Sequence, residues 1–320
     1  MKIHAAILFA ALIFSVPEMT RAADKESPTN AVSHSDKLQS IVDRAVKTAL
    51  EKFADKKLQT NEIAVTLVDL RNPEKPTQAS YRGGEQIYPA SVIKLFYLAA
   101  AHRWMEDGRL KDADELRRAM KDMIVDSYNE ATGYIVDLLT DTTSGPELSA
   151  EELEKWYEKR NAVNRYFASL GYSNINANRK PWGEGPYGRE TQSVKIHKPN
   201  HRNWLTTDAT ARLLTSIVTH KEVSAKRCAE MLAILKRDPF DTSSSANGQA
   251  TSYTGKGLPK GSKLWSKAGW TSETRHDDAY VELPGGEKFV LVTFTVNHAN
   301  EKEIISTVAK VVVEGMTSAK

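Results

Sequence analysis

Three short groups of residues carry side chains that acyl transfer requires, and they occur in this order: Ser91 with Lys94, Ser127 with Asn129, and Lys267 with Gly269. Together they supply a nucleophile, a proton relay and an anion-binding strand. A lysine one helical turn after a serine lies on the same helix face, and in a partly dry pocket its amine can lose its proton and act as a base. The order therefore predicts a serine enzyme that works through an acyl intermediate.

Ser91 follows Pro89 and Ala90 at the expected start of a helix. This position places its hydroxyl and backbone N–H at the positive end of the helix dipole, where a developing oxyanion is stabilised. The alternative is a helix-capping serine followed by a solvated lysine. The Ser-x-x-Lys pattern occurs once in this chain, at a strand-to-helix junction, which favours the nucleophile.

The three patterns, Ser91-Val-Ile-Lys94, Ser127-Tyr-Asn129 and Lys267-Ala-Gly269, resemble the signatures of class A β-lactamases and related penicillin-binding serine hydrolases. The resemblance spans residues 38–315. It implies that Ser127 relays a proton to the leaving nitrogen and that Asn129 binds the amide side chain of the substrate. It also implies an exported enzyme that acts on a β-lactam or a cell-wall peptide.

The third pattern falls on an expected strand, where Lys267 can attract a substrate carboxylate and Gly269 lets a substrate backbone approach. The resemblance gives Trp270 the second oxyanion N–H. Ala268 stands where the family has threonine or serine, so a hydroxyl for the carboxylate is missing. We expect Arg275 to supply part of the missing charge.

Two further departures concern turnover. Tyr128 replaces the family's aspartate, as in some D,D-peptidases. Class A enzymes carry a deacylating glutamate with an asparagine four residues later. Counting back the family's interval from a helix near Thr206 predicts Glu190 as the catalytic glutamate, but Val194 stands where the asparagine belongs, and Glu184 is a rival. We therefore expect deacylation to limit any lactam hydrolysis.

The elements that must position these residues follow from hydrophobic periodicity. The patterns predict helices over 38–53, 92–107, 116–125, 131–139, 151–170, 209–219 and 223–236 and from 304, and strands over 63–69, 79–82, 264–267, 278–283 and 289–296. Residues 172–203 read as irregular, with Trp182, Tyr187 and Trp204 either lining a groove or pinning the loop.

This order predicts an α/β (α+β) fold: a five-stranded antiparallel sheet flanked by N- and C-terminal helices, with an inserted all-helical subdomain. The catalytic domain spans 37–320, with a sheet lobe of 37–90 and 262–320 and a helical lobe of 91–261.

The N-terminal residues resemble a secretory signal, with Lys2 before an apolar run that is too short to span a bilayer. We expect cleavage after Ala22 and a flexible leader over 23–36. The alternative is an uncleaved anchor, but no later stretch is long enough to span a membrane. Export implies a periplasmic or secreted protein with no stable membrane anchor.

The charge and cysteine content of the chain limit the kinds of partner and cofactor that we expect. Without residues 1–22, which hold two basic residues and one acidic residue, 42 basic residues face 40 acidic ones. Such balance argues against nucleic acid and leaves a small-molecule substrate. The single cysteine, Cys228, lies at helical spacing with apolar residues, so we expect it to be buried. The histidines form no metal-binding motif, and we expect no cofactor and a monomer.

The sequence thus predicts hydrolysis of the β-lactam amide through an acyl-enzyme on Ser91. One alternative is a peptidoglycan D,D-peptidase or an esterase on the same scaffold. Another is a module that binds or senses lactams without turnover, which an intact Ser91 and Lys94 pair without a deacylating base would produce.

Overall fold

The computed structural model describes residues 32–182, 185–198, 200–243 and 248–318. The predicted signal peptide, the leader up to residue 31 and the rival Glu184 lie outside the described residues. Within that part of the chain, no helix is both long and apolar enough to cross a membrane.

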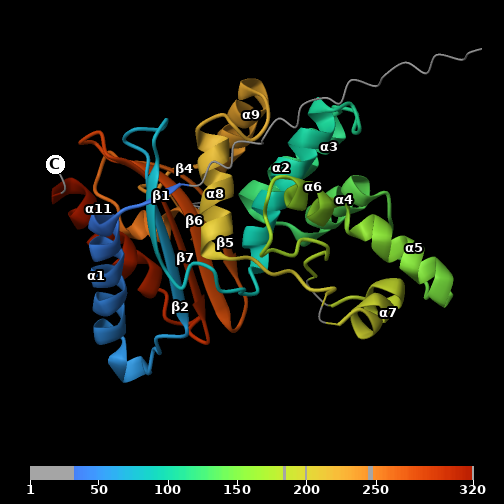
Figure 1. Ribbon diagram of the computed structural model, residues 1–320, viewed down its shortest axis with the longest axis horizontal. Coiled ribbons are helices and arrows are strands. Elements are labelled where there is room, and N and C mark those ends of the chain that lie inside the picture. The colour runs from blue at the N-terminus through green and yellow to red at the C-terminus, as the bar shows by residue number, and fades with distance from the viewer. Residues whose placement is uncertain (1–31, 183–184, 199, 244–247, 319–320) are drawn as a thin grey trace, which may run out of the picture. The chain divides into compact units, whose positions relative to one another are not determined.

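Within the described residues the centre of the fold is a mixed sheet of seven strands in the order β1-β3-β2-β7-β6-β5-β4 (Figure 1). The strands are β1 (Ser33–His34), β2 (Ile63–Asp69), β3 (Thr77–Tyr81), β4 (Lys236–Arg237), β5 (Lys263–Trp270), β6 (Thr274–Glu282) and β7 (Lys288–Val296). The α/β prediction is confirmed, but the prediction of five antiparallel strands is wrong. The two additional strands have two residues each, too few for an alternating pattern, and β1 runs parallel to β3.

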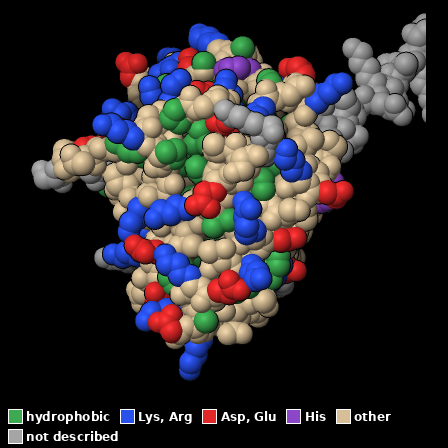
Figure 2. All heavy atoms as spheres, turned by 90° about the vertical axis from the view of Figure 1, so that its left-hand side faces the viewer, with side chains coloured by type: hydrophobic (Ala, Val, Ile, Leu, Met, Phe, Trp, Pro, Cys, Tyr) green, Lys and Arg blue, Asp and Glu red, His purple; other side chains and the backbone are tan. Residues whose placement is uncertain are grey.

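One face of the sheet is covered by α1 (Asp36–Lys52) and α11 (Ile304–Ser318), which come from opposite ends of the described chain (Figure 1). Their apolar residues at steps of three and four form one core with the sheet, as Leu38, Val42 and Val312 show. Figure 2, seen from this side, shows basic and acidic side chains interspersed, in keeping with the balanced charge.

The opposite face packs against α8 (Thr207–Val218) and the helices around α2 (Ile93–Glu106). Nearly every side chain of α2 is buried, which makes it the central helix of this second core. Cys228 is fully buried here, as predicted.

The other helices are α3 (Asp114–Lys121), α4 (Asn129–Thr140), α5 (Ala150–Arg160), α6 (Ala162–Ser169), α7 (Gly188–Ile196), α9 (Ala225–Leu235) and α10 (Gly248–Thr251), with short turns η1 (Ala54–Lys56), η2 (Ala90–Val92), η3 (Asp122–Asp126) and η4 (Thr254–Gly257).

Three predicted elements differ from the structure. The helix expected over 151–170 breaks at Asn161, whose side-chain amide donates to the Tyr157 carbonyl and competes with the helical ladder. The helix expected over 116–125 ends at Lys121 and continues as the π-helical turn η3. The segment 172–203, expected to be irregular, contains α7. Glycines and prolines flank this helix, so the sequence pattern indicated a loop.

Candidate active site

Ser91 lies in the tight turn η2, between the chain that leaves β3 and the start of α2. Ala90, just before it, has a φ of 47°, a left-handed conformation that an alanine adopts only when its surroundings impose it. The half-exposed Ser91 hydroxyl has no hydrogen-bond partner among the described residues. The turn therefore presents an unengaged serine hydroxyl on a fixed backbone.

β5 supports this turn directly. β4 pairs only with Leu264 and Trp265, so the later part of β5 is open on that side and lies against η2. A Cβ atom on Gly269 would lie 2.8 Å from the Ser91 nitrogen and 2.9 Å from the Pro89 oxygen. These are backbone atoms that cannot move aside cheaply, so only glycine permits this close approach.

His276 on β6 fixes the segment before the nucleophile. Its Nδ1 accepts from the Thr295 backbone N–H at 3.1 Å, so its Nε2 carries the proton and donates to the Tyr88 carbonyl at 2.9 Å. Burial lowers the pKa of His276 to about 4, which keeps this donor neutral. The histidine thus ties Tyr88, three residues before Ser91, to the sheet.

Lys94 is fully buried one turn after Ser91. Its Nζ lies at hydrogen-bond distance from the Ser127 carbonyl, from Asn129 Oδ1 (2.9 Å) and from Ser127 Oγ (3.2 Å). Burial lowers the pKa of Lys94 to about 7, against a smaller opposing effect of the Glu130 carboxylate. In the neutral form the two N–H groups satisfy the carbonyl and the amide oxygen, and the lone pair remains able to take a proton.

Ser127 ends the π-helical turn η3 in a left-handed conformation, with a φ of 60°. Its hydroxyl lies between two lysines, 3.2 Å from Lys94 Nζ and 3.0 Å from Lys267 Nζ. The structure therefore brings one residue of each sequence pattern to a single oxygen atom. Such a hydroxyl can exchange protons with either amine.

Lys267 is also fully buried, and its amine faces inward. Besides Ser127 Oγ, it contacts Gln249 Oε1 at 2.7 Å and the Ala268 carbonyl at 2.6 Å. Three acceptors use all three N–H groups of an ammonium. Burial, with the nearby charges of Lys94 and Arg237, lowers the pKa of Lys267 well below its usual value. Geometrically, Lys267 serves Ser127 more directly than it serves a substrate anion.

Two residues that sequence reasoning missed join β5 to the π-helical turn. Arg237 donates to the Ser266 carbonyl at 3.2 Å and to the Ile124 carbonyl at 2.8 Å. The side-chain amide of Gln249 donates to the Val125 carbonyl at 2.8 Å, while its oxygen accepts from Lys267. Both side chains satisfy carbonyl groups of η3 and so hold Ser127 in place.

Two buried carboxyl groups of β6 lie behind Lys267. Asp278 Oδ1 accepts from the Lys267 backbone N–H at 3.1 Å, and Asp277 Oδ2 accepts from the Thr254 N–H at 3.0 Å. Burial raises the pKa of Asp277 to about 6 and raises that of Asp278 well above its usual value. These groups are the acidic side of a charge cluster whose basic side is Lys267 and Arg237.

The remaining predicted site residues divide into exposed and buried ones. Trp270 and Tyr128, which follow Gly269 and Ser127, are 54% and 58% exposed and form the rim. Ala268 is buried and packs with Tyr253 and Ile305.

Arg275 is 7% exposed, lies 3.9 Å from the centroid of the Tyr253 ring and donates to the Ser252 carbonyl at 3.2 Å. The predicted replacement charge is thus engaged inside the protein.

The structure does not bring Glu190 to the serine cluster. Among the described residues its carboxylate contacts Arg160 at 2.7 Å and the Ser144 hydroxyl at 3.0 Å, and Lys180 Nζ lies 3.7 Å away. Glu190 lies on α7 and is completely buried. Its catalytic role stays a prediction, and its contacts are those of a structural ion pair.

Among the described residues no group of three or more His, Cys, Asp or Glu side chains could hold a metal ion. The chemistry that the described side chains offer is nucleophilic and acid–base: a serine hydroxyl, two lysines of lowered pKa and a second serine between them.

The chain was compared with curated proteins, solved structures and family models. No curated protein matches the chain. Among solved structures, the chain resembles a β-lactamase from Sphaerobacter thermophilus DSM 20745 (19% identity, TM-score 0.62, 86% of this chain and 97% of that one) and a β-lactamase from Chitinophaga pinensis DSM 2588 (16%, 0.61, 88% and 100%). It also resembles a mutant of PBP-A solved as its acyl-enzyme complex with penicillin G (16%, 0.60, 87% and 97%). These likenesses show the fold. A model of the β-lactamase enzyme family matches residues 44–316, and the chain therefore belongs to that family.

Proposed function

We propose that this protein is an exported serine hydrolase that opens the amide of a β-lactam through an acyl-enzyme on Ser91. The observation that carries the proposal is the meeting of Lys94 and Lys267 at the Ser127 hydroxyl, beside a turn held against Gly269. Membership of the β-lactamase enzyme family supports the reaction class. The signal-like N-terminal residues support a periplasmic or secreted location.

In the acylation step Ser91 Oγ attacks the substrate carbonyl carbon while its proton passes to the neutral amine of Lys94. The carbonyl electron pair moves onto the oxygen, which the backbone N–H groups of Ser91 and Trp270 stabilise. When the intermediate collapses, the C–N bond breaks and the Ser127 hydroxyl gives its proton to the leaving nitrogen. The ammonium of Lys94 then returns a proton to Ser127, and the relay is neutral again.

Deacylation needs a water molecule and a base placed against the ester. The carboxylate of Glu190 is held by Arg160, and no contact among the described residues links it to Lys94 or Ser127. A displacement of one ångström can cost about a hundredfold in rate. This observation favours a second candidate: a D,D-peptidase, an esterase or a penicillin sensor whose acyl-enzyme is long-lived.

Mass spectrometry of the protein after brief exposure to penicillin tests both candidates. We expect a covalent adduct of intact penicillin on the peptide that contains Ser91. Rapid mixing with the chromogenic cephalosporin nitrocefin should then show a burst near one equivalent followed by a slow phase. Steady turnover without a burst would support the efficient lactamase. Absence of an adduct with both penicillin and a fluorophosphonate would overturn the serine-nucleophile proposal.

A further inference from the structure

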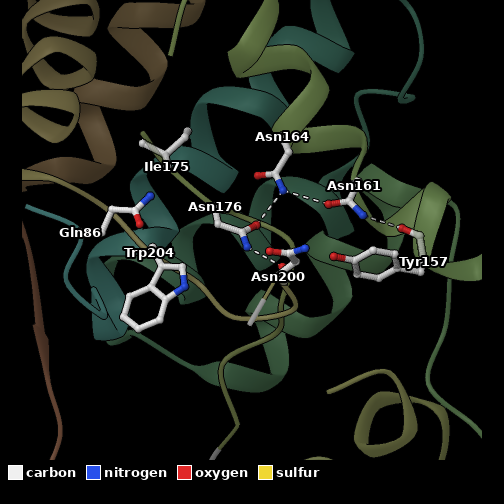
Figure 3. A pocket seen from close by; sticks show the side chains of 8 residues that line it. All are labelled: Gln86, Tyr157, Asn161, Asn164, Ile175, Asn176, Asn200 and Trp204. Carbon is white, nitrogen blue, oxygen red and sulfur yellow. Dashed lines mark hydrogen bonds between the residues drawn. The ribbon is translucent and has the colours of Figure 1, made fainter. Parts of the chain in front are cut away.

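A cavity of about 420 Å³ lies beside α5 and α6, lined by residues that take no part in the serine site (Figure 3). Its lining residues are Gln86, Tyr157, Asn161, Asn164, Ile175, Asn176, Asn200 and Trp204. The volume falls within the range of about 300–1,000 Å³ that is usual for small-molecule sites. Five of the eight residues carry side-chain amides, which is unusual for pockets that are mostly apolar.

Three asparagines form a fixed floor (Figure 3). The Asn164 amide donates to Asn161 Oδ1 at 2.9 Å and to Asn176 Oδ1 at 2.7 Å, and its own oxygen accepts from the Ala177 N–H at 2.6 Å. These bonds set which end of each amide is the donor and which is the acceptor. The floor is therefore organised before any ligand arrives, which lowers the entropic cost of binding.

Other lining residues carry side-chain polar groups that are still available to a ligand. The side-chain amides of Gln86 and Asn200 and the indole N–H of Trp204 have no hydrogen-bond partner among the described residues. Figure 3 shows the Tyr157 hydroxyl directed toward Asn200, and Asn161 and Asn178 lie close enough to Tyr157 to hydrogen-bond with it. Gln86 and Asn200 are exposed and Trp204 is half-exposed, so a ligand can reach them.

The lining chemistry selects a class of ligand. Amides donate and accept hydrogen bonds in equal measure, as the neighbouring hydroxyl groups of a sugar require, and aromatic rings suit the apolar face of a sugar ring. None of the lining residues is acidic or basic, although the Arg202 guanidinium lies 4.6 Å from the centroid of the Trp204 ring, so the lining itself offers an ionised ligand no charged partner. We propose that this cavity binds a neutral saccharide of one or two sugar rings.

The cavity and the serine site share one segment of the chain. Gln86 lies five residues before Ser91, and its neighbour Ile87 pairs with Leu205, next to Trp204. A bound saccharide would therefore contact the same segment that presents the nucleophile. Binding itself does not depend on acyl transfer, so the two proposals can fail separately.

Isothermal titration calorimetry of the mature protein with di-N-acetylchitobiose and with cellobiose tests the proposal. We expect saturable binding of at least one sugar. Gln86→Ala with Asn200→Ala should weaken it about tenfold, because each removes hydrogen bonds that only the ligand uses. Binding of the chitobiose alone would identify an N-acetylated amino sugar, and binding of both would identify a general neutral saccharide.

Asn174→Ala is the matched control, since this exposed amide lies on the same segment but donates to the Gly84 carbonyl outside the cavity. It should leave binding unchanged. The rate of penicillin labelling should be the same in all variants, which also checks their folding. No heat with either sugar at 10 mM, equal weakening by Asn174→Ala, or equal binding of glucuronate would overturn the proposal.

Discussion

Two clusters of buried charge are built in opposite ways. At the serine site, two lysine amines meet at the neutral hydroxyl of Ser127. Around α7, by contrast, Arg160 contacts the Glu190 carboxylate at 2.7 Å and Lys180 contacts Asp137 at 2.6 Å.

In the first cluster burial lowers the pKa of both lysines, and that of Lys94 to about 7. In the second, each cation has a carboxylate partner within ion-pair distance. The two clusters therefore differ in one respect that burial alone does not set: only the second gives each cation a direct carboxylate partner. We expect changes in the first cluster to slow acylation and changes in the second to lower the stability of the fold.

Replacing the nucleophile has the largest expected effect. Ser91→Ala should abolish labelling by penicillin and by a fluorophosphonate, because we propose that the Ser91 hydroxyl is the attacking group. Intact-mass spectrometry measures the label, and a thermal unfolding curve should show an unchanged midpoint. Labelling at the wild-type level would mean that the serine cluster is not the reactive one.

Lys94→Met should slow acylation by at least about a hundredfold, since general base catalysis contributes factors of this order. Methionine fills the same space without a buried amine, so the fold should remain intact. Stopped-flow acylation with nitrocefin gives the rate. A near-normal rate at neutral pH would show that Lys94 does not accept the proton.

Lys267→Ala should slow acylation about tenfold or more through its contact with Ser127, with similar losses for neutral esters and for carboxylate-bearing lactams. The comparison of the two substrate types decides the role of this lysine. A loss confined to the charged substrate would show instead that Lys267 binds the substrate carboxylate.

The pH dependence sharpens the contrast further. Because Lys94 must be neutral to accept a proton and its pKa is about 7, acylation should rise about tenfold between pH 6 and pH 8. The single-turnover rate against pH measures this limb. In Lys94→Met the limb should disappear, and a flat wild-type profile would contradict the assignment.

Glu190→Gln should have the smallest effect on acylation, less than about twofold per folded molecule. It should lower stability by about 1–3 kcal/mol, because Arg160 loses the nearer of its two carboxylate partners and keeps only Asp137 at 3.3 Å. Urea unfolding measures the loss, and Glu151→Gln, at an exposed pair, is the control. A longer-lived adduct in Glu190→Gln with unchanged stability would restore Glu190 as the deacylating base.

Much of the serine site was predictable from sequence because its parts are local. A helix places Lys94 one turn from Ser91, and a strand places Gly269 two residues from Lys267, so spacing alone encodes these relations. Arg237 and Gln249 could not be predicted, because they act across space on backbone carbonyls of a π-helical turn.

The fold shows the same division between local and non-local information. Long amphipathic helices and alternating strands could be predicted from the periodicity of apolar residues, whereas β1 and β4 are defined only by their pairing with distant residues. Counting an interval to Glu190 assumes that no element has been added in between. The segment in fact contains α7, a helix with few apolar residues on which Glu190 itself lies, so an interval counted in sequence could not give the direction or the contacts of its side chain.

Because of the π-helical turn η3, the position of the Ser127 side chain depends on the number of residues in that turn. A turn of this type holds one residue more than an α-helical turn. Removing one residue from Asp122–Asp126 would let the helix become regular, but it would rotate Ser127 by about 100° and shift it by about 1.5 Å along the axis. The hydroxyl would then leave both lysines. A deletion that improves local helical geometry would thus separate the Ser127 hydroxyl from both lysines, so the contact between them requires this irregular turn.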